Sequence, residues 1–109
     1  MRHIKRRYLA VMAESDDRID ERELIKAVWG MIYQLFGEYG ASQVGMFHID
    51  LQDDKEIAVL RCSHTAIDMV RAAIAVISQI SNRPVALRVV AISGTLKALR
   101  RKIHHLKKK

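Results

Sequence analysis

The sequence predicts an α+β fold in which one antiparallel sheet of four strands carries two helices on one face, followed by a terminal helix. Two observations lead to this prediction. Four short segments have the length and apolar content of β-strands, and residues 46–51 among them alternate between apolar and polar residues; two segments between these strands repeat their apolar residues with the period of an α-helix. The 109 residues, half of them hydrophobic and only one a proline, suffice for a single core.

The first strand and the first helix occupy the N-terminal third of the chain. A strand is predicted over residues 6–13, with Tyr8, Ala10 and Met12 on one side and Leu9, Val11 and Ala13 on the other. Asp20 and Glu23 then form a capping pair for the helix that follows, and Gly37 ends this helix. Its expected core-facing stripe consists of Leu24, Ile25, Val28, Trp29, Ile32, Leu35 and Phe36.

Two further strands are predicted to form a hairpin. A loop over residues 37–45 leads to alternation over 46–51, a polar turn over 52–55 and a returning strand over 56–62. In the first of these strands the expected core-facing residues are Phe47, Ile49 and Leu51, and the expected outward-facing residues are His48 and Asp50.

The remaining elements are a second helix, a fourth strand and a terminal helix. Ser63 caps a helix over residues 64–80, and residues 81–84, which contain the proline, break it. Residues 85–92 form the fourth strand, and residues 96–106 form an amphipathic helix.

This order, β-α-β-β-α-β followed by a helix, is that of a ferredoxin-like (RNA-recognition-like) α/β sandwich. We expect one domain over residues 1–106 and a basic tail over residues 107–109. No segment has the apolar length of a membrane span, and none has the features of a secretion signal. The single cysteine cannot form an internal disulfide, which fits a reducing environment, so we expect a cytoplasmic protein.

Two helices leave one face of such a sheet uncovered. The face toward the helices is expected to carry Leu9, Val11, Phe47, Ile49 and Leu60. The opposite face is expected to carry Tyr8, Met12, His48, Ile57, Val59, Arg61 and Arg88. This face is too apolar to stay in water, so another protein, the terminal helix or both should cover it. RNA stacking is the alternative, although the strand over residues 56–62 has no aromatic residue.

The terminal helix has one apolar and one basic face. The apolar stripe consists of Leu96, Leu99, Ile103 and Leu106, and the basic face of Lys97, Arg101, His104 and Lys108. Such a helix can lie on anionic lipid, dock on a partner or follow a phosphate backbone. The stripe lacks a Trp or Phe anchor, so we favour packing on the sheet or a partner, with the basic face toward nucleic acid.

Charge is strongly segregated along the chain. The formal net charge is +7, and from Met69 to the end there are ten lysines and arginines but no acid. Residues 1–13 add four cations without an acid, and all twelve carboxylates lie within residues 14–68. Neutralised phosphates release condensed counterions, so this pattern favours a nucleic-acid partner. A basic surface kept for solubility is the alternative.

No constellation of residues predicts catalysis. Cys62 and His64 stand two apart at a strand end, but two ligands do not make a zinc site, and a buried cysteine is the favoured interpretation. Acylphosphatases share this element order, but the single asparagine, Asn82, lies in the turn before the last strand, which argues against that enzyme. We expect no metal or cofactor in the protein itself.

The turn formed by Ser93, Gly94 and Thr95 leads into the terminal helix and has two interpretations. Free backbone amides in a glycine turn make an anion site, and Lys97 in the first helical turn favours a phosphate there. The alternative is a plain helix cap with Thr95 as the N-cap.

Four motifs together resemble a known family. They are the basic opening with Arg2 and Lys5-Arg6-Arg7-Tyr8, Phe36-Gly37-Glu38 with Gly40, Leu60-Arg61-Cys62, and Ser93-Gly94-Thr95-Leu96-Lys97. In order and spacing they resemble the small α–β protein subunit of archaeal and eukaryotic ribonuclease P, and the short chain is similar to the archaeal members.

The resemblance implies a non-catalytic subunit of a ribonucleoprotein that removes 5′ leaders from precursor tRNA. The RNA subunit would carry the chemistry with Mg²⁺. The protein partners it implies are a barrel-shaped subunit and a second copy of this chain, within a heterotetramer.

Resemblance and charge together give the candidate site residues. The candidate RNA contacts are Arg2, Lys5, Arg6, Arg7, Arg61, Arg88, Ser93, Gly94, Thr95, Lys97, Arg101 and Lys108. The candidate interface residues are Tyr8, Met12, Ile57, Val59, Leu99 and Ile103. One alternative is a free-standing RNA-binding module that stacks bases on Tyr8. A small-molecule enzyme on the same fold is the other alternative.

Overall fold

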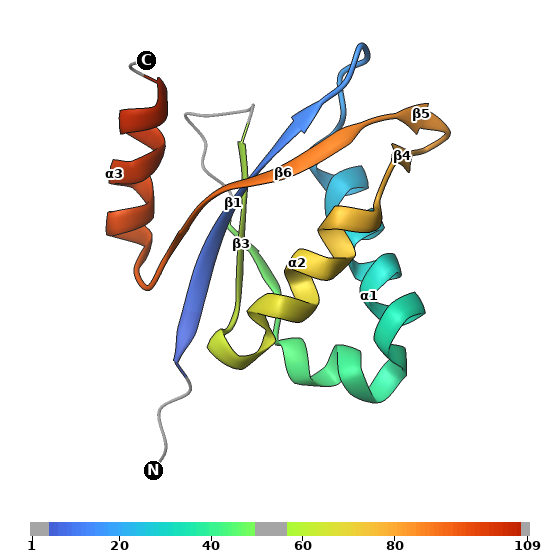
Figure 1. Cartoon of the computed structure of the whole chain (residues 1–109), viewed down its shortest axis with the longest axis horizontal. Helices are drawn as coiled ribbons and strands as arrows, with labels where there is room; N and C mark the ends of the chain where they lie inside the picture. Colours follow the sequence, from blue (N-terminus) through green and yellow to red (C-terminus); the bar gives the residue numbers. More distant parts are fainter. Residues whose placement is uncertain (1–4, 50–56, 108–109) are drawn as a thin grey trace.

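The computed structural model describes residues 5–49 and 57–107, in which four strands form one sheet in the order β2-β3-β1-β6 (Figure 1). All neighbouring strands are antiparallel. The elements are β1 (Arg6–Glu14), α1 (Glu21–Val44), β2 (Phe47–Ile49), β3 (Ile57–Ser63), η1 (His64–Ala66), α2 (Ile67–Val76), β4 (Gln79–Ile80), β5 (Arg83–Pro84), β6 (Ala86–Ser93) and α3 (Leu96–Lys107). The predicted α+β fold, with a four-stranded antiparallel sheet and three helices, is confirmed.

Strand β1 lies at the centre of the sheet and is buried on both faces. Leu9 and Val11 belong to the larger core, which α1 and α2 close, whereas Ala10 belongs to a smaller core on the other face. Between β1 and β6 the register shifts: Ala10 lies opposite Ala91 but Val11 lies opposite Val89. Val90 is therefore the extra residue of a β-bulge, which twists the edge strand β6.

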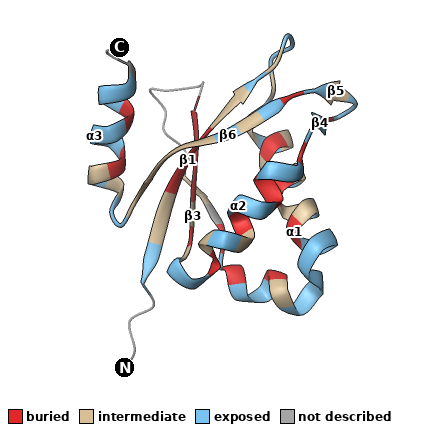
Figure 2. Ribbon diagram, viewed as in Figure 1, coloured by how far each residue is buried: buried red, intermediate tan, exposed pale blue. Residues whose placement is uncertain are grey.

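Helix α3 covers the face of the sheet that α1 and α2 leave open (Figure 1). Leu99 and Ile103 of α3 are buried against Ala10, Ile57 and Val59 of the sheet, and the buried side of α3 faces the strands in Figure 2. The prediction that the terminal helix covers this face is confirmed. No helix in the described part of the chain is long and apolar enough to span a membrane.

The predicted facing of strand β2 is wrong. His48 lies opposite Leu60, on the side of α1 and α2, and its Nε2 is 3.1 Å from Oε2 of Glu21. Ile49 lies opposite Val59 and packs with the smaller core under α3. Alternation alone gives the period of a strand but not its phase, and the contact with Glu21 lets a polar ring occupy the covered face. Leu51 and Asp50 lie outside the described residues.

Helix α1 extends past the predicted end at Gly37. Gly37 has φ 72° and ψ −179°, which bends the helix, but helical residues continue to Val44 and Gly45 ends them with φ 57°. The predicted loop over residues 37–45 is therefore largely helical. Leu35 and Phe36, expected in the core, are 45% and 36% exposed, so the core-facing stripe of α1 ends before the bend.

Asp20 caps α1 as predicted, since its carboxylate accepts a hydrogen bond from the Arg22 amide. The prediction that Glu23 takes part in the cap is wrong, because its carboxylate instead binds the guanidinium of Arg83 at 2.5 Å. Ser63 also makes no side-chain cap. A partner sixty residues away in the sequence has thus displaced the local interaction at Glu23.

The second helix ends earlier than predicted. Helix α2 stops at Val76, and residues expected in its last turn form a small hairpin of β4 and β5. Ser81 and Asn82 at its tip both have positive φ values, 52° and 64°, as a two-residue hairpin turn requires. The apolar period over residues 64–80 therefore overstated the helix by one turn.

Candidate nucleic-acid interface

The basic start of β1 and the end of β6 meet at one end of the sheet. Tyr8 lies opposite Ser93, and Nη1 of Arg7 is 3.3 Å from the place that a Cβ on Gly94 would take. The lack of a side chain at Gly94 thus lets the guanidinium lie against the turn. The amide of His64 donates to the Lys5 carbonyl at 2.9 Å, which fixes the chain just before β1.

The turn itself is built as a helix cap. The Ala98 amide donates to Oγ1 of Thr95 at 3.2 Å, and the Leu99 amide donates to the Thr95 carbonyl at 3.1 Å. The interpretation of Thr95 as an N-cap is confirmed. One of the free amides that an anion would use is therefore already satisfied from within the chain.

The exposed side of α3 is basic and free of acids. Lys97, Arg100 and Arg101 are exposed, and the three ion pairs found in the described part of the chain all lie elsewhere. Nζ of Lys102 donates to the Ile92 carbonyl at 2.6 Å, which ties the helix to the end of β6. The cations of α3 thus form a positive surface that no described carboxylate neutralises.

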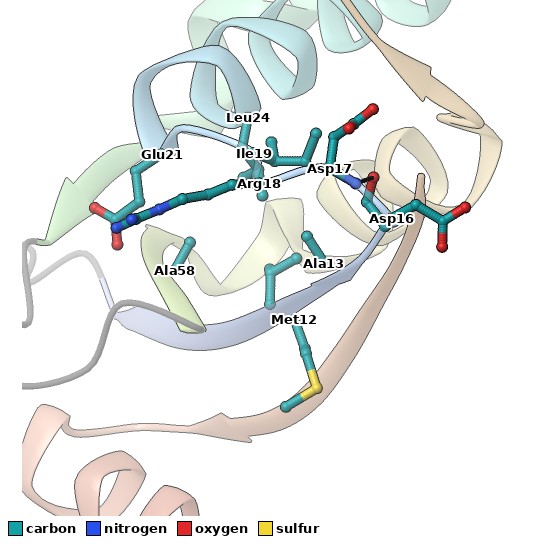
Figure 3. Close-up of a pocket in the computed structure, with 11 residues that line it drawn as sticks. Met12, Ala13, Asp16, Asp17, Arg18, Ile19, Glu21, Leu24 and Ala58 are labelled. Carbon is teal, nitrogen blue, oxygen red and sulfur yellow. Dashed lines mark hydrogen bonds between the residues drawn. The ribbon is translucent and has the colours of Figure 1, made fainter. Parts of the chain in front are cut away.

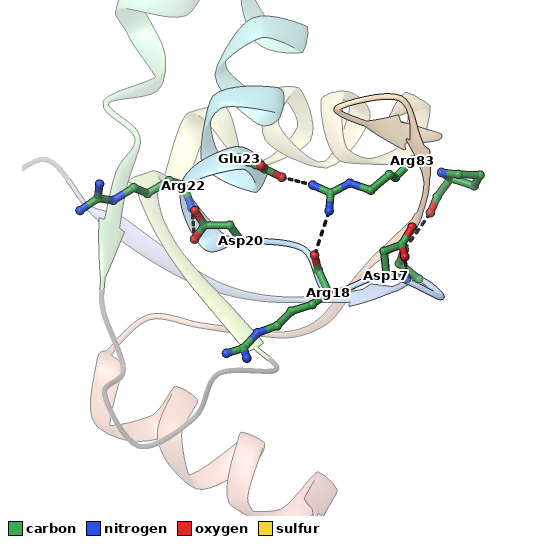
Figure 4. A network of polar contacts seen from close by, with 8 residues as sticks. Asp17, Arg18, Asp20, Arg22, Glu23 and Arg83 are labelled. Carbon is green, nitrogen blue, oxygen red and sulfur yellow. Dashed lines mark hydrogen bonds and ion pairs between the residues drawn. The ribbon is translucent and has the colours of Figure 1, made fainter.

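The opposite end of the sheet is acidic and internally paired. Arg88 lies there, with its Nη2 2.6 Å from Oε1 of Glu14. Figure 4 shows the guanidinium of Arg83 between the Glu23 carboxylate and the Arg18 carbonyl. Arg83 and Arg88 are therefore paired with carboxylates, unlike the exposed cations of α3.

A pocket of about 530 Å³ opens at this acidic end (Figure 3). Asp16, Asp17 and Glu21 line it together with apolar residues of β1, and Arg18 extends across it toward Glu21. No group of three or more His, Cys, Asp or Glu among the described residues is arranged to hold a metal ion. The pocket has no nucleophile paired with a base.

The structure brings most of the candidate RNA contacts to one end. Lys5, Arg6, Arg7, Ser93, Gly94, Thr95 and Lys97 lie there, and Arg61 stands beside them, opposite Tyr8. Arg101 lies further along α3, and Arg88 lies at the acidic end. Arg2 and Lys108 are outside the described residues. Lys102 is not among the predicted contacts, but its hydrogen bond to the Ile92 carbonyl joins α3 to this surface, and its place in the acid-free basic run of residues 100–102 is the sequence feature that points to it.

The candidate interface residues form the smaller core. Ile57, Val59, Leu99 and Ile103 are buried between the sheet and α3, and Tyr8 and Met12 are partly buried beside them. Their contacts are thus made within the chain. Since α3 lies over this face, Tyr8 does not stand on an open sheet surface where bases could stack.

Cys62 is a buried core residue, as expected. Burial raises the pKa of its thiol from 9.0 to about 11, so the sulfur stays protonated at neutral pH and is a poor nucleophile or metal ligand. The ring of His64 lies near the Lys5 carbonyl, with Nδ1 3.3 Å from that oxygen.

Fold and surface together define a small α+β protein that carries its unopposed cations on one end of a four-stranded sheet and on the exposed side of a third helix. The sequence model of the Rpp14/Pop5 family matches residues 7–104, and the chain belongs to this family.

Several relatives carry the name ribonuclease P protein component 2. The protein of that name from Pyrococcus furiosus is 26% identical over 98 residues, covering 90% of this chain and 82% of the relative. The one from Natronomonas pharaonis is 32% identical over 100 residues, covering 88% of this chain and 62% of the relative. A chain in the cryo-EM structure of yeast ribonuclease MRP has a similar fold, with a TM-score of 0.66, 15% identity and coverage of 99% of this chain and 95% of that one.

Proposed function

We propose that this chain is a protein subunit of ribonuclease P that binds the catalytic RNA and supports removal of 5′ leaders from precursor tRNA. The observation that carries the proposal is the family match over residues 7–104, within which relatives are named as ribonuclease P components. The unopposed cations of α3 and of the start of β1 supply the chemistry that such a role needs.

In this proposal the protein is not the catalyst. Hydrolysis, with its Mg²⁺ ions, belongs to the RNA subunit, and the protein screens the repulsion between the phosphates of the two RNAs. The barrel-shaped subunit, the second copy of the chain and the heterotetramer are protein partners in the same proposal. We also propose that the sheet and its helices have the ferredoxin-like topology, that the chain is archaeal and that it is cytoplasmic.

The observed fold argues against the alternative of a free-standing module that stacks bases on its sheet. Tyr8 is partly buried next to α3, and the described residues of β3 include no aromatic side chain. An RNA contact through the basic side of α3 needs no open sheet.

The experiment is a cleavage assay of precursor tRNA by the reconstituted RNA and protein subunits at moderate Mg²⁺, with and without this chain. We expect the chain to raise the cleavage rate and to lower the Mg²⁺ concentration needed. A rate unchanged by the chain would contradict the proposal.

A matched pair of variants separates the cationic surface from net charge. Lys97→Glu with Arg100→Glu reverses two exposed cations of α3, and Lys26→Glu with Arg71→Glu reverses two exposed cations of α1 and α2. The first pair should abolish most of the stimulation, and the second should retain it. Equal losses would show that only the total charge matters.

A further inference from the structure

An open groove runs along the junction of α3 with the edge strand β6. Its volume is about 550 Å³, and it is lined by Val90, Ala91, Arg101, Lys102, His105 and Leu106. In Figure 1, α3 stands beside the last part of β6, where the strand turns into the helix. The groove combines aliphatic side chains from both elements with three basic side chains from α3 alone.

The aliphatic part of the groove consists of side chains that the fold does not fully cover. Leu99 and Ile103 of the α3 stripe are buried, but Leu106, one turn further on, is 42% exposed. Val90 is the bulged residue of β6, without a partner on β1, and it is only partly buried. The apolar stripe of α3 thus continues beyond the sheet that buries its first turns, and together with Val90 and Ala91 it gives the groove an apolar floor.

Charge indicates what would cover this surface. Neither β6 nor α3 contains an acid, and Arg101 and Lys102 take part in none of the ion pairs of the described residues. A segment with carboxylates around an apolar side chain would place that side chain on Val90 and Leu106 and its carboxylates near the basic side chains. Complementary charge of this kind steers encounter and fixes orientation.

The form of the segment follows from the edge of β6. Addition of another strand needs free carbonyls in a regular row, but Lys102 already occupies the Ile92 carbonyl and the bulge at Val90 breaks the row. A helix that lays its apolar face in a groove needs neither. RNA is the less suitable occupant, because the exposed lining of the groove is mostly apolar and His105 is the only ring in it on which a base could stack.

We propose that the groove between β6 and α3 binds an acidic amphipathic helix of a protein partner. The exposed side chains at the bend of α1 (Tyr33, Leu35, Phe36 and Tyr39) form another apolar surface, but no charge pattern there indicates an occupant. The proposal for the groove does not rest on the proposed role with RNA, and its test contains no ribonuclease P RNA.

The test uses a synthetic helical peptide of Glu, Ala and Leu with the leucines on one face. Binding to the full chain is followed by fluorescence anisotropy and by amide shifts in NMR spectra. Leu106→Ser and Arg101→Glu should each weaken binding by about tenfold or more, a change that corresponds to about 1.4 kcal/mol. Peptides with Leu replaced by Ser, or Glu by Gln, should bind correspondingly less well.

Matched controls lie elsewhere on the surface. Leu35→Ser removes a leucine of nearly equal exposure (45%) from the bend of α1, and Arg71→Glu reverses an exposed cation of α2. Both should leave peptide binding unchanged. The proposal is overturned if the peptide fails to bind, if the controls weaken it as much as the groove variants do, or if a single-stranded oligouridine, like the peptide, shifts the amides of Val90, Ala91 and Leu106 in the apolar part of the groove.

Discussion

Cys62 shows how a single residue of this fold is isolated from solvent. Its side chain belongs to the larger core, between β3 and the helices α1 and α2, and burial raises its pKa to about 11. Only the thiolate reacts with disulfide reagents. The native protein should therefore react very slowly with DTNB at pH 8, and the protein unfolded in urea should react at once. A fast reaction of the folded protein would contradict this burial.

The same thiol makes stability depend on pH in one window. The folded state keeps its proton up to a pKa of about 11, whereas the unfolded chain loses it from the ordinary value of 9.0. The contribution of the protonated Cys62 thiol to the free energy of unfolding is therefore complete below pH 9 and is lost as the pH rises from 9 toward 11. Urea midpoints measured across this window should fall more steeply for the wild type than for Cys62→Ala.

Thr95 is expected to act on stability through the cap of α3. Thr95→Ala removes the oxygen that accepts from the Ala98 amide, and loss of an N-cap costs about 1 kcal/mol of the free energy of unfolding. Urea denaturation measures the change. Thr95→Ser, which keeps the oxygen, is the control and should stay close to wild type.

At the scale of elements, α3 is held by two buried side chains, Leu99 and Ile103. Leu99→Ala leaves a cavity between α3 and the sheet and should lower the free energy of unfolding by about 2–5 kcal/mol. Leu106→Ala, in the same helix but exposed, should cost about 0.5 kcal/mol or less. Denaturation of both variants tests this, and the Leu99 variant should also bind more ANS as the second sheet face opens. Equal effects would mean that α3 does not pack as described.

The elements that the sequence predicts well are those with long periodic patterns. Strand β1 follows from a continuous apolar run, as a strand buried on both faces has, and helix α3 follows from helical spacing of its apolar residues, because burial of one face imposes that spacing. Gly37 predicts the end of α1, but Ala41 and Val44 beyond it are buried and keep the chain helical past a bend. The β4-β5 hairpin was missed because two-residue strands carry no period.

For the whole molecule, the separation of charge predicts unequal roles for two arginines. Arg7 lies at the basic end against Gly94, whereas Arg88 is paired with Glu14 at the acidic end. For RNA binding, the slope of log K against log salt is negative. Arg7→Gln should make this slope shallower by about 0.7–0.9, as loss of one phosphate contact does. Arg88→Gln should leave the slope unchanged. Titrations at several salt concentrations measure both, and a larger effect at Arg88 would place the RNA at the other end of the sheet.

The candidate site could be predicted from the sequence only in part. Segregated charge predicts that a cationic surface exists, since no acid follows Asp68. It does not predict that Arg88 lies apart from the others, because that depends on strand pairing across seventy-four residues. The groove beside α3 could not be predicted from the sequence either, because nothing in the residues of β6 indicates the bulge at Val90.

The central position of β1 has a consequence for how the protein is made. Its two neighbours, β3 and β6, both come later in the chain, so a ribosome delivers the middle of the sheet long before its flanks. The pairing with β6 and the docking of α3 must wait until the C-terminus has left the exit tunnel, and long-range pairing of this kind is slow. Until then, Ile57 and Val59 have no cover on that face, and a nascent chain halted at this stage would be a natural client for chaperones.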